Sequence, residues 1–291
     1  MKRILITGAD SYIGTAFEKY VSSFPNDYSV DTVDMIDGSW KDSSFSGYDV
    51  VFHVAGIAHS DISKVGDEVK ELYRKVNTEL AIETAEKAKA DGVSQFIFMS
   101  SMIVYGDSAP IGKEKVITKD TVPTPANFYG NSKLNAEKGI EPLRDESFKV
   151  VILRPPMIYG KNSKGNYPVL AKYAQKLPFF PYVKNRRSML YVGNLCEFIK
   201  LMIDNGESGL FFPANKEDSV TSLLVKSVSK AHNKKLLLVK GFGWLFRIAA
   251  PIVPKINKIF GNLSYDEKLT EYSSEYRLFS LEDSVKETES V

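Results

Sequence analysis

Several features are scarce in this sequence, and each absence excludes a class of protein. Of its 291 residues only Cys196 is a cysteine, which excludes an internal disulfide framework and is typical of a reducing compartment. The 38 basic and 36 acidic residues leave a net charge of +2, so no strong field indicates a nucleic-acid partner. No run of about 18 apolar residues occurs, so no membrane-spanning helix is expected.

The N-terminus also lacks the long apolar stretch of a secretion signal. Its short apolar run, Ile4–Ile6, is soon interrupted by Gly8, Asp10 and Gly14. There is no low-complexity segment and no internal repeat, and no metal site is expected. Hydrophobic residues make up 43% of the chain and charged residues 25%, as in ordinary globular proteins. These observations favour a cytoplasmic enzyme with one large domain or two unequal ones.

The first half of the sequence alternates between apolar, β-rich runs and helical patterns. Runs typical of buried parallel strands cover residues 3–7, 30–33, 49–54, 96–99 and 150–153. Apolar residues recur at helical spacing after the first run and again between Val69 and Ala88, with Gly92 as the expected stop. The alternation predicts an α/β fold of the Rossmann type, with a doubly wound parallel sheet.

A glycine-bearing turn, Gly8–Gly14, follows the first run and leads into a helical pattern. Glycines let a backbone approach a pyrophosphate, and the free N–H groups at a helix N-terminus can bind it. Asp34 ends the second run, where a carboxylate can bind the ribose hydroxyls of an adenosine. No arginine adjoins Asp34, which favours NAD over NADP, although Lys41 keeps NADP open.

Three further positions could contact the same dinucleotide. Ala55 and Gly56 follow the third run, and small residues there would let the cofactor pass over the strand end. Asn77 interrupts the apolar stripe of the long helical segment. Its spacing leaves two interpretations open, a polar contact near the nicotinamide or an ordinary asparagine on the helix surface.

A tyrosine and a lysine carry the chemistry that the pattern predicts. Tyr129 and Lys133 are four residues apart, so they share one face of a helix, where the ammonium can stabilise the phenolate. A phenol with an ordinary pKa of about 10 could then work near neutral pH. Ser100 and Ser101 end the fourth run and could hold a carbonyl while a nicotinamide exchanges a hydride. Taken alone, these residues also fit a solvated helix face and a helix cap.

Six motifs occur in the order found in extended short-chain dehydrogenases, the nucleotide-sugar epimerases, dehydratases and reductases, and the chain resembles that family over roughly residues 1–200. They are Thr7-Gly8-xxx-Tyr12-Ile13-Gly14, Phe52-His53-Val54-Ala55, Ser100-Ser101-xx-Val104-Tyr105-Gly106, Tyr129-xxx-Lys133, Arg154-Pro155-xxx-Tyr159-Gly160 and Arg187-xxx-Tyr191-Val192.

The resemblance implies a role for each residue at a matching position. The implied cofactor-binding residues are Gly8, Ser11, Tyr12, Ile13, Gly14, Asp34, Ala55, Gly56, Asn77, Lys133 and Pro155. The implied catalytic residues are Ser101, Tyr129 and Lys133, with Tyr129 as the acid or base. The implied substrate-binding residues are Ser100, Met157 and Arg187. An arginine at the last position commonly meets the substrate's diphosphate, the alternative being a salt-bridged surface arginine. The family also leads us to expect a homodimer.

The chain departs from the family pattern at several of these positions. Ser11 replaces the middle glycine of the turn, which is expected to constrain the backbone and alter the pyrophosphate contact. Met102 and Ile103 stand where 4,6-dehydratases carry an acidic pair, so dehydration, which needs an extra acid and base, is not expected. Met157 replaces an asparagine of many epimerases, and Gly193–Asn194 replaces a usual pair of aspartates, which leaves the sugar open.

Within the family, three segments resemble capsule and surface-polysaccharide reductases of Gram-positive bacteria. These are Phe148–Gly160, Arg187–Tyr191 and Phe260–Leu263. The resemblance implies NAD(P)-dependent reduction, at carbon 4, of a UDP-4-keto-6-deoxy-N-acetylhexosamine. A nucleotide-sugar 4-epimerase is the alternative, and a non-catalytic dinucleotide-binding regulator is the second alternative.

The strand–helix rhythm is lost beyond residue 165, apart from 188–192 and the helix after it. We therefore expect a dinucleotide-binding domain of residues 1–165, to which 186–204 return, and a smaller C-terminal substrate-binding lobe of residues 166–291.

Two segments of this second half can be interpreted further. The apolar segment Phe242–Leu263 contains Pro251 and Pro254 and carries Arg247, Lys255 and Lys258. It fits a pair of short helices that cap the lobe, or an interfacial segment that reaches a lipid-linked sugar. The polar tail after Leu281 is expected to be loosely ordered.

Overall fold

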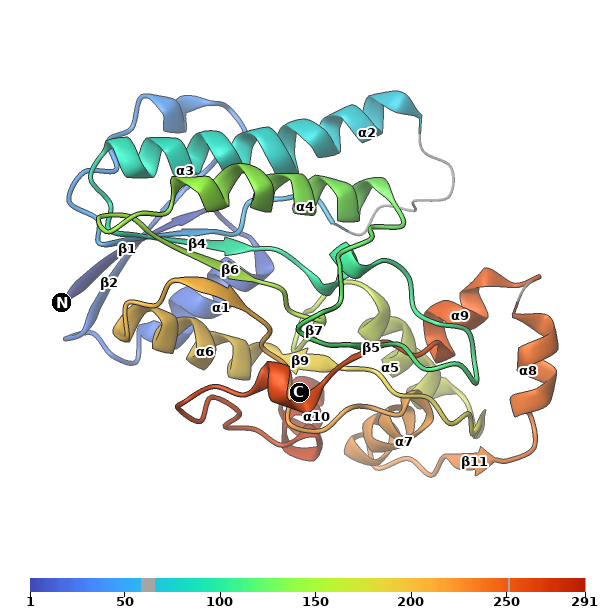
Figure 1. Cartoon of the computed structure of the whole chain (residues 1–291). Coiled ribbons are helices and arrows are strands. Elements are labelled where there is room, and N and C mark those ends of the chain that lie inside the picture. The colour runs from blue at the N-terminus through green and yellow to red at the C-terminus, as the bar shows by residue number, and fades with distance from the viewer. Residues whose placement is uncertain (59–65, 251, 291) are drawn as a thin grey trace. The chain divides into compact units, whose positions relative to one another are not determined.

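The computed structural model describes residues 1–58, 66–250 and 252–290, and the chain forms two compact units (Figure 1). Unit 1 comprises residues 1–106, 123–155 and 196–212. Unit 2 comprises residues 107–122, 156–195 and 213–291. The sequence predicted a domain boundary after residue 165, and in the structure the chain passes from unit 1 to unit 2 after Pro155. The sequence also predicted that residues 186–204 belong to the first domain, and the segment that rejoins unit 1 is 196–212.

Unit 1 is built on a parallel sheet of six strands in the order β10-β6-β4-β3-β1-β2. These strands are β1 (Lys2–Thr7), β2 (Tyr28–Val33), β3 (Val50–His53), β4 (Gln95–Met99), β6 (Lys149–Leu153) and β10 (Gly209–Phe211). The strand order reverses between β1 and β3, and ligands of such sheets bind beyond the carboxyl ends of the strands at this point. The predicted doubly wound parallel sheet is confirmed.

Helices cover both faces of this sheet (Figure 1). On one side lie α1 (Tyr12–Val21) and α6 (Val192–Asp204), and on the other α3 (Leu80–Ala90) and α4 (Phe128–Ile140). Three fully buried alanines of α3 recur at helical spacing and pack against sheet residues such as Phe96. Because these side chains are small, α3 approaches the sheet closely, and large strand residues fill the core.

The long helix predicted between residues 69 and 88 is interrupted. The structure has α2 (Asp67–Tyr73), a π-helical turn (Arg74–Glu79) and then α3. A π turn inserts an extra residue and rotates the side chains that follow, and such turns often occur at functional sites. Here the turn contains Asn77, whose side chain it buries completely.

Unit 2 contains short strands in parallel pairs, surrounded by helices. The strands are β5 (Val116–Ile117), β7 (Met157–Tyr159), β8 (Phe179–Pro181), β9 (Met189–Tyr191), β11 (Leu237–Val239) and β12 (Ser264–Tyr265). The pairs are β7 with β9, β8 with β11 and β5 with β12. Two larger helices, α5 (Asn166–Lys176) and α7 (Thr221–Ala231), bury their apolar faces in one core with Tyr159 and Phe180.

The apolar segment after β11 folds as two short helices, α8 (Gly243–Ala249) and α9 (Pro254–Phe260). Pro254 is the first helical residue of α9, where its missing N–H group costs no hydrogen bond. Pro251 lies outside the described residues. Across the described ranges, no helix combines the length and apolar character needed to cross a bilayer.

The prediction of a loosely ordered tail is wrong. Residues Leu281–Glu289 form helix α10, which Ser280 caps by accepting a hydrogen bond from the N–H group of Asp283. Val285 is buried in the core of unit 2. The composition of the tail is polar because most of the helix faces solvent, while one narrow stripe packs inward.

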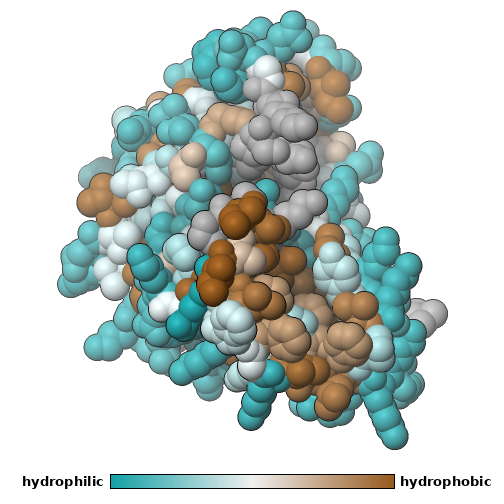
Figure 2. Space-filling view, turned by 90° about the vertical axis from the view of Figure 1, so that its right-hand side faces the viewer, coloured by the Kyte–Doolittle hydropathy of each residue, from teal (hydrophilic) through white to brown (hydrophobic). Residues whose placement is uncertain are grey.

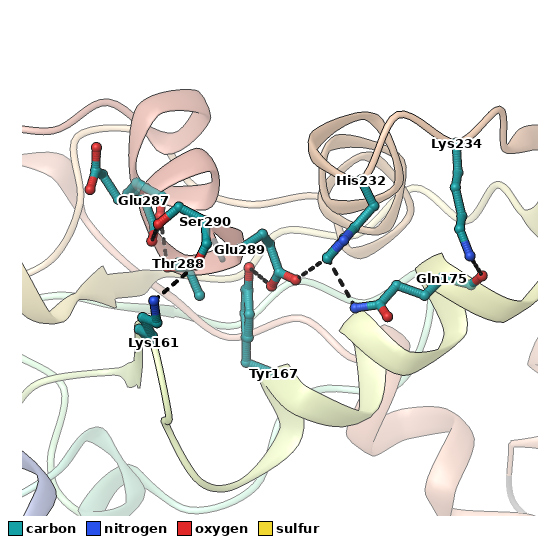
Figure 3. A network of polar contacts seen from close by, with 10 residues as sticks. Lys161, Tyr167, Gln175, His232, Lys234, Glu287, Thr288, Glu289 and Ser290 are labelled. Carbon is teal, nitrogen blue, oxygen red and sulfur yellow. Dashed lines mark hydrogen bonds and ion pairs between the residues drawn. The ribbon is translucent and has the colours of Figure 1, made fainter.

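Polar contacts hold the end of α10 in place (Figure 3). Glu289 accepts a hydrogen bond of 2.9 Å from the Tyr167 hydroxyl of α5, and its other oxygen lies 2.6 Å from Nε2 of His232. Lys161 donates to the backbone carbonyl of Ser290 at 3.0 Å. Sequence polarity alone could not show these partners, because they come from segments more than fifty residues away.

Candidate active site

The carboxyl ends of the parallel strands bring most of the candidate residues of unit 1 to one edge. Thr7 of β1 pairs in register with His53 of β3, and Met99 of β4 pairs with Leu153 of β6. The residues that follow these strand ends therefore emerge side by side, as open α/β sheets require of a ligand site. They are Gly8, Asp34, Ala55, Gly56, Ser100, Ser101, Arg154 and Pro155.

Gly8 forms the floor of the turn after β1. Its φ is +103°, and a Cβ atom on it would lie 2.8 Å from the backbone nitrogen of Ala55. Both the conformation and the close approach require glycine here. Ser11, which replaces a family glycine, has φ −68° and ψ 141°, so the substitution leaves the backbone unstrained.

The same turn positions the N-terminus of α1. The Ser11 hydroxyl accepts a hydrogen bond of 3.2 Å from the N–H group of Gly14, and Tyr12 and Ile13 form the first turn of the helix. At the end of β2, Asp34 is exposed, and its carboxylate accepts the N–H group of Ile36 at 3.0 Å. A glycine turn, a helix N-terminus and an exposed carboxylate at neighbouring strand ends fit a dinucleotide.

Asn77 anchors the loop that follows β3. Its side-chain oxygen accepts from the Ile57 N–H group at 2.7 Å, and its amide donates to the Ile57 carbonyl at 3.0 Å and to Ser132 at 3.2 Å. The interpretation of Asn77 as a surface residue is therefore wrong. A Cβ atom on Gly56 would lie 3.0 Å from Oδ1 of Asn77 and 3.4 Å from Nζ of Lys133, so a side chain there would crowd both groups.

Ser101 lies beside Tyr129 and favours its ionised form. Ser101 also caps the short turn Met102–Tyr105 by accepting from the Ile103 N–H group at 3.2 Å, so the catalytic and capping interpretations describe one side chain. Helix α4 approaches this turn through Gly130, where a Cβ atom would lie 2.9 Å from the Ile103 carbonyl oxygen. Pro155 holds the other side of the turn, since its carbonyl accepts the Met102 N–H group at 2.8 Å.

The phenol of Tyr129 is a neutral group at physiological pH. Burial and, to a lesser extent, the neighbouring Tyr73 raise its pKa to about 12, while Ser101 acts in the opposite direction. The Tyr73 ring lies edge-on to the Tyr129 ring, with 5.9 Å between centroids. In this arrangement Tyr129 is suited to donate a proton.

Lys133 lies one helical turn further along α4 and is buried. Its ammonium donates to the Met99 carbonyl at 2.8 Å and lies 4.8 Å from the centre of the Phe98 ring. Burial lowers the pKa of Lys133 to about 8, and Glu137 opposes this shift. The spacing of Tyr129 and Lys133 predicted that the ammonium stabilises the phenolate. In this structure the Tyr129 pKa is set by burial, Tyr73 and Ser101, and Lys133 does not contribute.

A buried ion pair under α4 was not anticipated from the sequence. Arg154 binds both carboxylate oxygens of Glu137 and donates to the Tyr105 hydroxyl at 2.7 Å. Ser100 donates to the same carboxylate, so its hydroxyl faces protein in this structure. The available signal was that Glu137 follows Lys133 by four residues on one helix face.

Like Glu137, His53 was given no role by the sequence. Its Nδ1 atom lies 2.8 Å from the Thr7 hydroxyl, and its ring stacks between those of Phe96 and Phe98. Burial and the positive charge of Lys133 lower the pKa of His53 to about 3, so the ring stays neutral. It lies beside the Lys133 ammonium without adding charge.

In unit 2, Met157 and Arg187 line the same pocket. Met157 of β7 pairs in register with Met189 of β9, and Arg187 precedes β9 by two residues. The rest of the pocket is lined by Asn166, Val169, Leu170, Met189, Ser219, Thr221, Leu224, Lys258 and Ile259. The two substrate-binding residues predicted in this half of the chain are therefore brought together.

The Arg187 guanidinium is not neutralised by an acid among the described residues. Its Nη1 donates to the Lys258 carbonyl at 2.6 Å, and burial lowers its pKa. Lys258 lines the same pocket, so the lining includes two basic residues and no acidic one. The salt-bridged surface arginine of the alternative interpretation does not match this environment.

One departure from the family pattern has a structural explanation. Asn194, where the family has an acid, is fully buried, and its amide donates to Asn215 at 3.1 Å and to the Phe279 carbonyl at 3.0 Å. Its oxygen accepts the Phe279 N–H group at 3.0 Å. An amide serves here because the site needs both a donor and an acceptor.

Comparison with known proteins agrees with this geometry. Residues 4–212 match the model of the NAD dependent epimerase/dehydratase family. A UDP-glucose 4-epimerase of Vibrio cholerae is 30% identical, with 92% of this chain and 85% of that protein covered. The N-acetyl-alpha-D-glucosaminyl-diphospho-ditrans,octacis-undecaprenol 4-epimerase of Escherichia coli O157:H7 is 28% identical, with coverage of 80% and 73%.

Solved structures share the fold at lower sequence identity. A dTDP-4-dehydrorhamnose reductase of Clostridium acetobutylicum has a TM-score of 0.75 and 17% identity over 98% of each chain. A UDP-glucuronic acid 4-epimerase of Bacillus cereus, in complex with NAD, has a TM-score of 0.71 and 18% identity over 98% of this chain and 96% of that one. The match over residues 4–212 and the 30% identity to the Vibrio relative establish that the chain belongs to the NAD-dependent epimerase/dehydratase family of enzymes.

Proposed function

We propose that this protein reduces carbon 4 of a UDP-linked sugar, specifically a UDP-4-keto-6-deoxy-N-acetylhexosamine used for surface polysaccharide. The observation that carries the proposal is the neutral Tyr129 phenol, which lies beside Ser101 and one helical turn from the buried Lys133. A proton donor beside a hydroxyl that can orient a carbonyl is the arrangement that ketone reduction requires.

The cofactor that the family uses fits the edge of the sheet in unit 1. Gly8, Gly14 and the start of α1 would hold the pyrophosphate, Asp34 the adenosine ribose, and Lys133 the nicotinamide ribose. When bound, the nicotinamide supplies the hydride that reduces carbon 4. Lys41, the basic residue that kept NADP open, lies 2.7 Å from the carboxylate of Glu83, which supports NAD.

Three side chains would handle the proton at the carbonyl oxygen. Ser101 would donate a hydrogen bond that orients the carbonyl, and Tyr129 would transfer its own proton as the oxygen becomes an alkoxide. The Lys133 ammonium would then stabilise the tyrosinate until solvent returns a proton. Asn77 would act at a distance, since it holds the backbone of Ile57 beside Gly56.

The pocket of unit 2 supports a substrate with a diphosphate. Arg187 and Lys258 place two cations in it without a carboxylate among its lining residues, and a guanidinium binds phosphate oxygens in pairs. The apolar lining around Met157 and Leu170 would contact less polar parts of the substrate. The UDP carrier is suggested by the names of the Vibrio and Bacillus proteins.

Epimerisation at carbon 4 is the second candidate, because both curated relatives above carry that activity in their names. The name of the Escherichia relative also raises a lipid diphosphate as the sugar carrier. Turnover separates the candidates. A reductase consumes one reduced cofactor for each product, whereas an epimerase interconverts its sugars with no added cofactor consumed.

The test of the proposal compares Tyr129→Phe with Tyr173→Phe, which changes an exposed tyrosine of α5. Both variants and the wild type are incubated with the product of a sugar 4,6-dehydratase and reduced NAD or NADP, and the sugar formed is identified. Tyr129→Phe should lower kcat by roughly 100-fold to 10,000-fold, with unchanged thermal stability. If Tyr129→Phe retains full activity, Tyr129 is not the proton donor. If the wild type binds the dinucleotide but neither reduces nor epimerises any nucleotide sugar offered to it, a non-catalytic regulator is favoured.

A further inference from the structure

Helix α8 has its larger apolar face on the outside. Its inward positions are Phe246, whose ring lies 5.4 Å from that of Phe260, together with the small residues Gly243 and Ala249. No residue of α8 is fully buried. In an ordinary surface helix the large apolar side chains point to the core and polar ones to solvent, so α8 reverses the usual pattern.

The outward side chains form a patch of large apolar groups, which we call the α8 surface. Trp244 is 66% exposed, Ile248 63% and Ile252 80%, and Leu245 and Phe242 are also exposed. Figure 2 shows brown side chains gathered on this face of the molecule. A contiguous apolar patch of this kind on a folded protein marks an interaction site.

The charge of the surrounding segment indicates what the α8 surface contacts. Residues 219–265 contain eight lysines and arginines and no aspartate or glutamate. Lys240 and Arg247 flank Trp244 along the chain and are exposed. Within the described ranges, Lys240 and Arg247 form no ion pair, whereas Lys230 pairs with Glu282 at 3.1 Å. The basic groups next to the patch are therefore available to an anionic partner.

We propose that the α8 surface docks on an anionic lipid bilayer, with Trp244, Ile248 and Ile252 at the boundary between headgroups and acyl chains. An apolar face that carries tryptophan, rimmed by lysine and arginine, is the pattern of a segment that lies in the membrane interface. Each basic residue adds attraction to acidic headgroups. The helix is too short to span a bilayer and has only to rest on its surface.

Charge argues against a second copy of the chain as the occupant. A two-fold dimer through the α8 surface would bring the same basic residues of both copies against each other. Residues 219–265 contain no aspartate or glutamate, so this segment supplies no acid to relieve the repulsion. A flat field of acidic headgroups matches both the apolar patch and its basic rim.

Docking does not depend on the proposed reaction, so the two proposals can fail separately. The test is sedimentation of the full chain with vesicles of phosphatidylcholine alone and with vesicles that also contain the anionic lipid phosphatidylglycerol. Wild type should bind the anionic vesicles, and salt should weaken the binding. Trp244→Ser with Ile248→Ser should reduce partitioning by about tenfold or more, whereas Trp244→Phe should largely retain it. Lys240→Gln should weaken it by roughly fivefold.

Ile36→Ser is the matched control, because Ile36 of unit 1 is 92% exposed but lies outside this segment. It should bind vesicles like the wild type. Failure of the wild type to bind anionic vesicles would overturn the proposal, as would equal binding by the Trp244→Ser/Ile248→Ser variant. A dimer in solution that this double variant abolishes, with no vesicle binding by the wild type, would instead identify the α8 surface as an interface between copies.

Discussion

The two units of this protein each contain an arginine in a protein interior or pocket, and the two arginines have different partners. In unit 1 the guanidinium of Arg154 is buried with the carboxylate of Glu137, and Tyr105 and Ser100 complete the network. In unit 2 the Arg187 guanidinium has a backbone carbonyl and a second cation, Lys258, in its pocket. A buried ion pair holds its side chains in position. A guanidinium without a carboxylate partner can instead form charge-assisted hydrogen bonds with an anionic ligand.

The largest expected effect comes from breaking the pair in unit 1. Arg154→Met should lower the free energy of unfolding by about 3–5 kcal/mol, because it leaves the Glu137 carboxylate buried without its partner. Arg187→Met should change stability by less than about 1 kcal/mol, since no carboxylate depends on it. Denaturant unfolding of both variants measures the contrast. Equal losses would mean that the two arginines serve the same purpose.

The next effect concerns binding rather than stability. Arg187→Met should raise KM for the proposed UDP-sugar by roughly 10-fold to 100-fold with kcat little changed, because the proposed charge-assisted contact, of about 1.5–3 kcal/mol, would be lost. Arg187→Lys keeps the charge but not the paired donors and should lie in between. Steady-state kinetics checks this. A fall in kcat with an unchanged KM would place Arg187 at the reacting centre.

The pH dependence of kcat/KM should report the pKa of Lys133, another buried basic residue of unit 1. Burial lowers the pKa of Lys133 to about 8, so the ammonium that we propose to stabilise the tyrosinate during turnover is present below pH 8 and lost above it. In the reductive direction kcat/KM should therefore fall as pH rises through about 8, by about tenfold per pH unit. A profile that stays flat from pH 7 to 10 would contradict this role of Lys133.

The smallest effect on stability is expected in the polar network of unit 2, because the Glu289 carboxylate there is only partly buried. Glu289→Gln weakens the contacts of α10 with Tyr167 and His232. A loss of about 1 kcal/mol is expected, which lowers Tm by roughly 2–4 °C. The exposed Glu287→Gln on the same helix serves as the control and should leave Tm unchanged. Matching melting curves for Glu289→Gln and wild type would show that α10 contributes little.

The sequence predicted the sheet well because parallel strands carry a local signal. The apolar runs at 3–7 and 96–99 correspond to β1 and β4, and each ends within the range expected. The same method predicted a single helix through residue 77 and missed the π turn, because one inserted residue barely changes an apolar periodicity. It also misread the tail, since the partners of Glu289 come from α5 and from His232 after α7.

The candidate site was predicted in part for the same reason. Residues that directly follow strands, such as Gly8, Asp34 and Ser101, could be identified because the edge of a parallel sheet gathers them. Glu137 and His53 could not, because their importance depends on burial and on partners from other elements. A sequence shows that a residue is charged but not whether the fold removes it from water.

The sequence by itself determined the parallel sheet, the glycine turn and the Tyr129–Lys133 spacing, because each depends on residues close together in the chain. The tertiary structure decided which charges are compensated, which helix faces are covered and which side chains titrate away from their ordinary pKa. It neutralises Arg154, leaves Arg187 available and exposes the apolar side of α8. These outcomes depend on desolvation by distant segments, a quantity that exists only once the chain has folded.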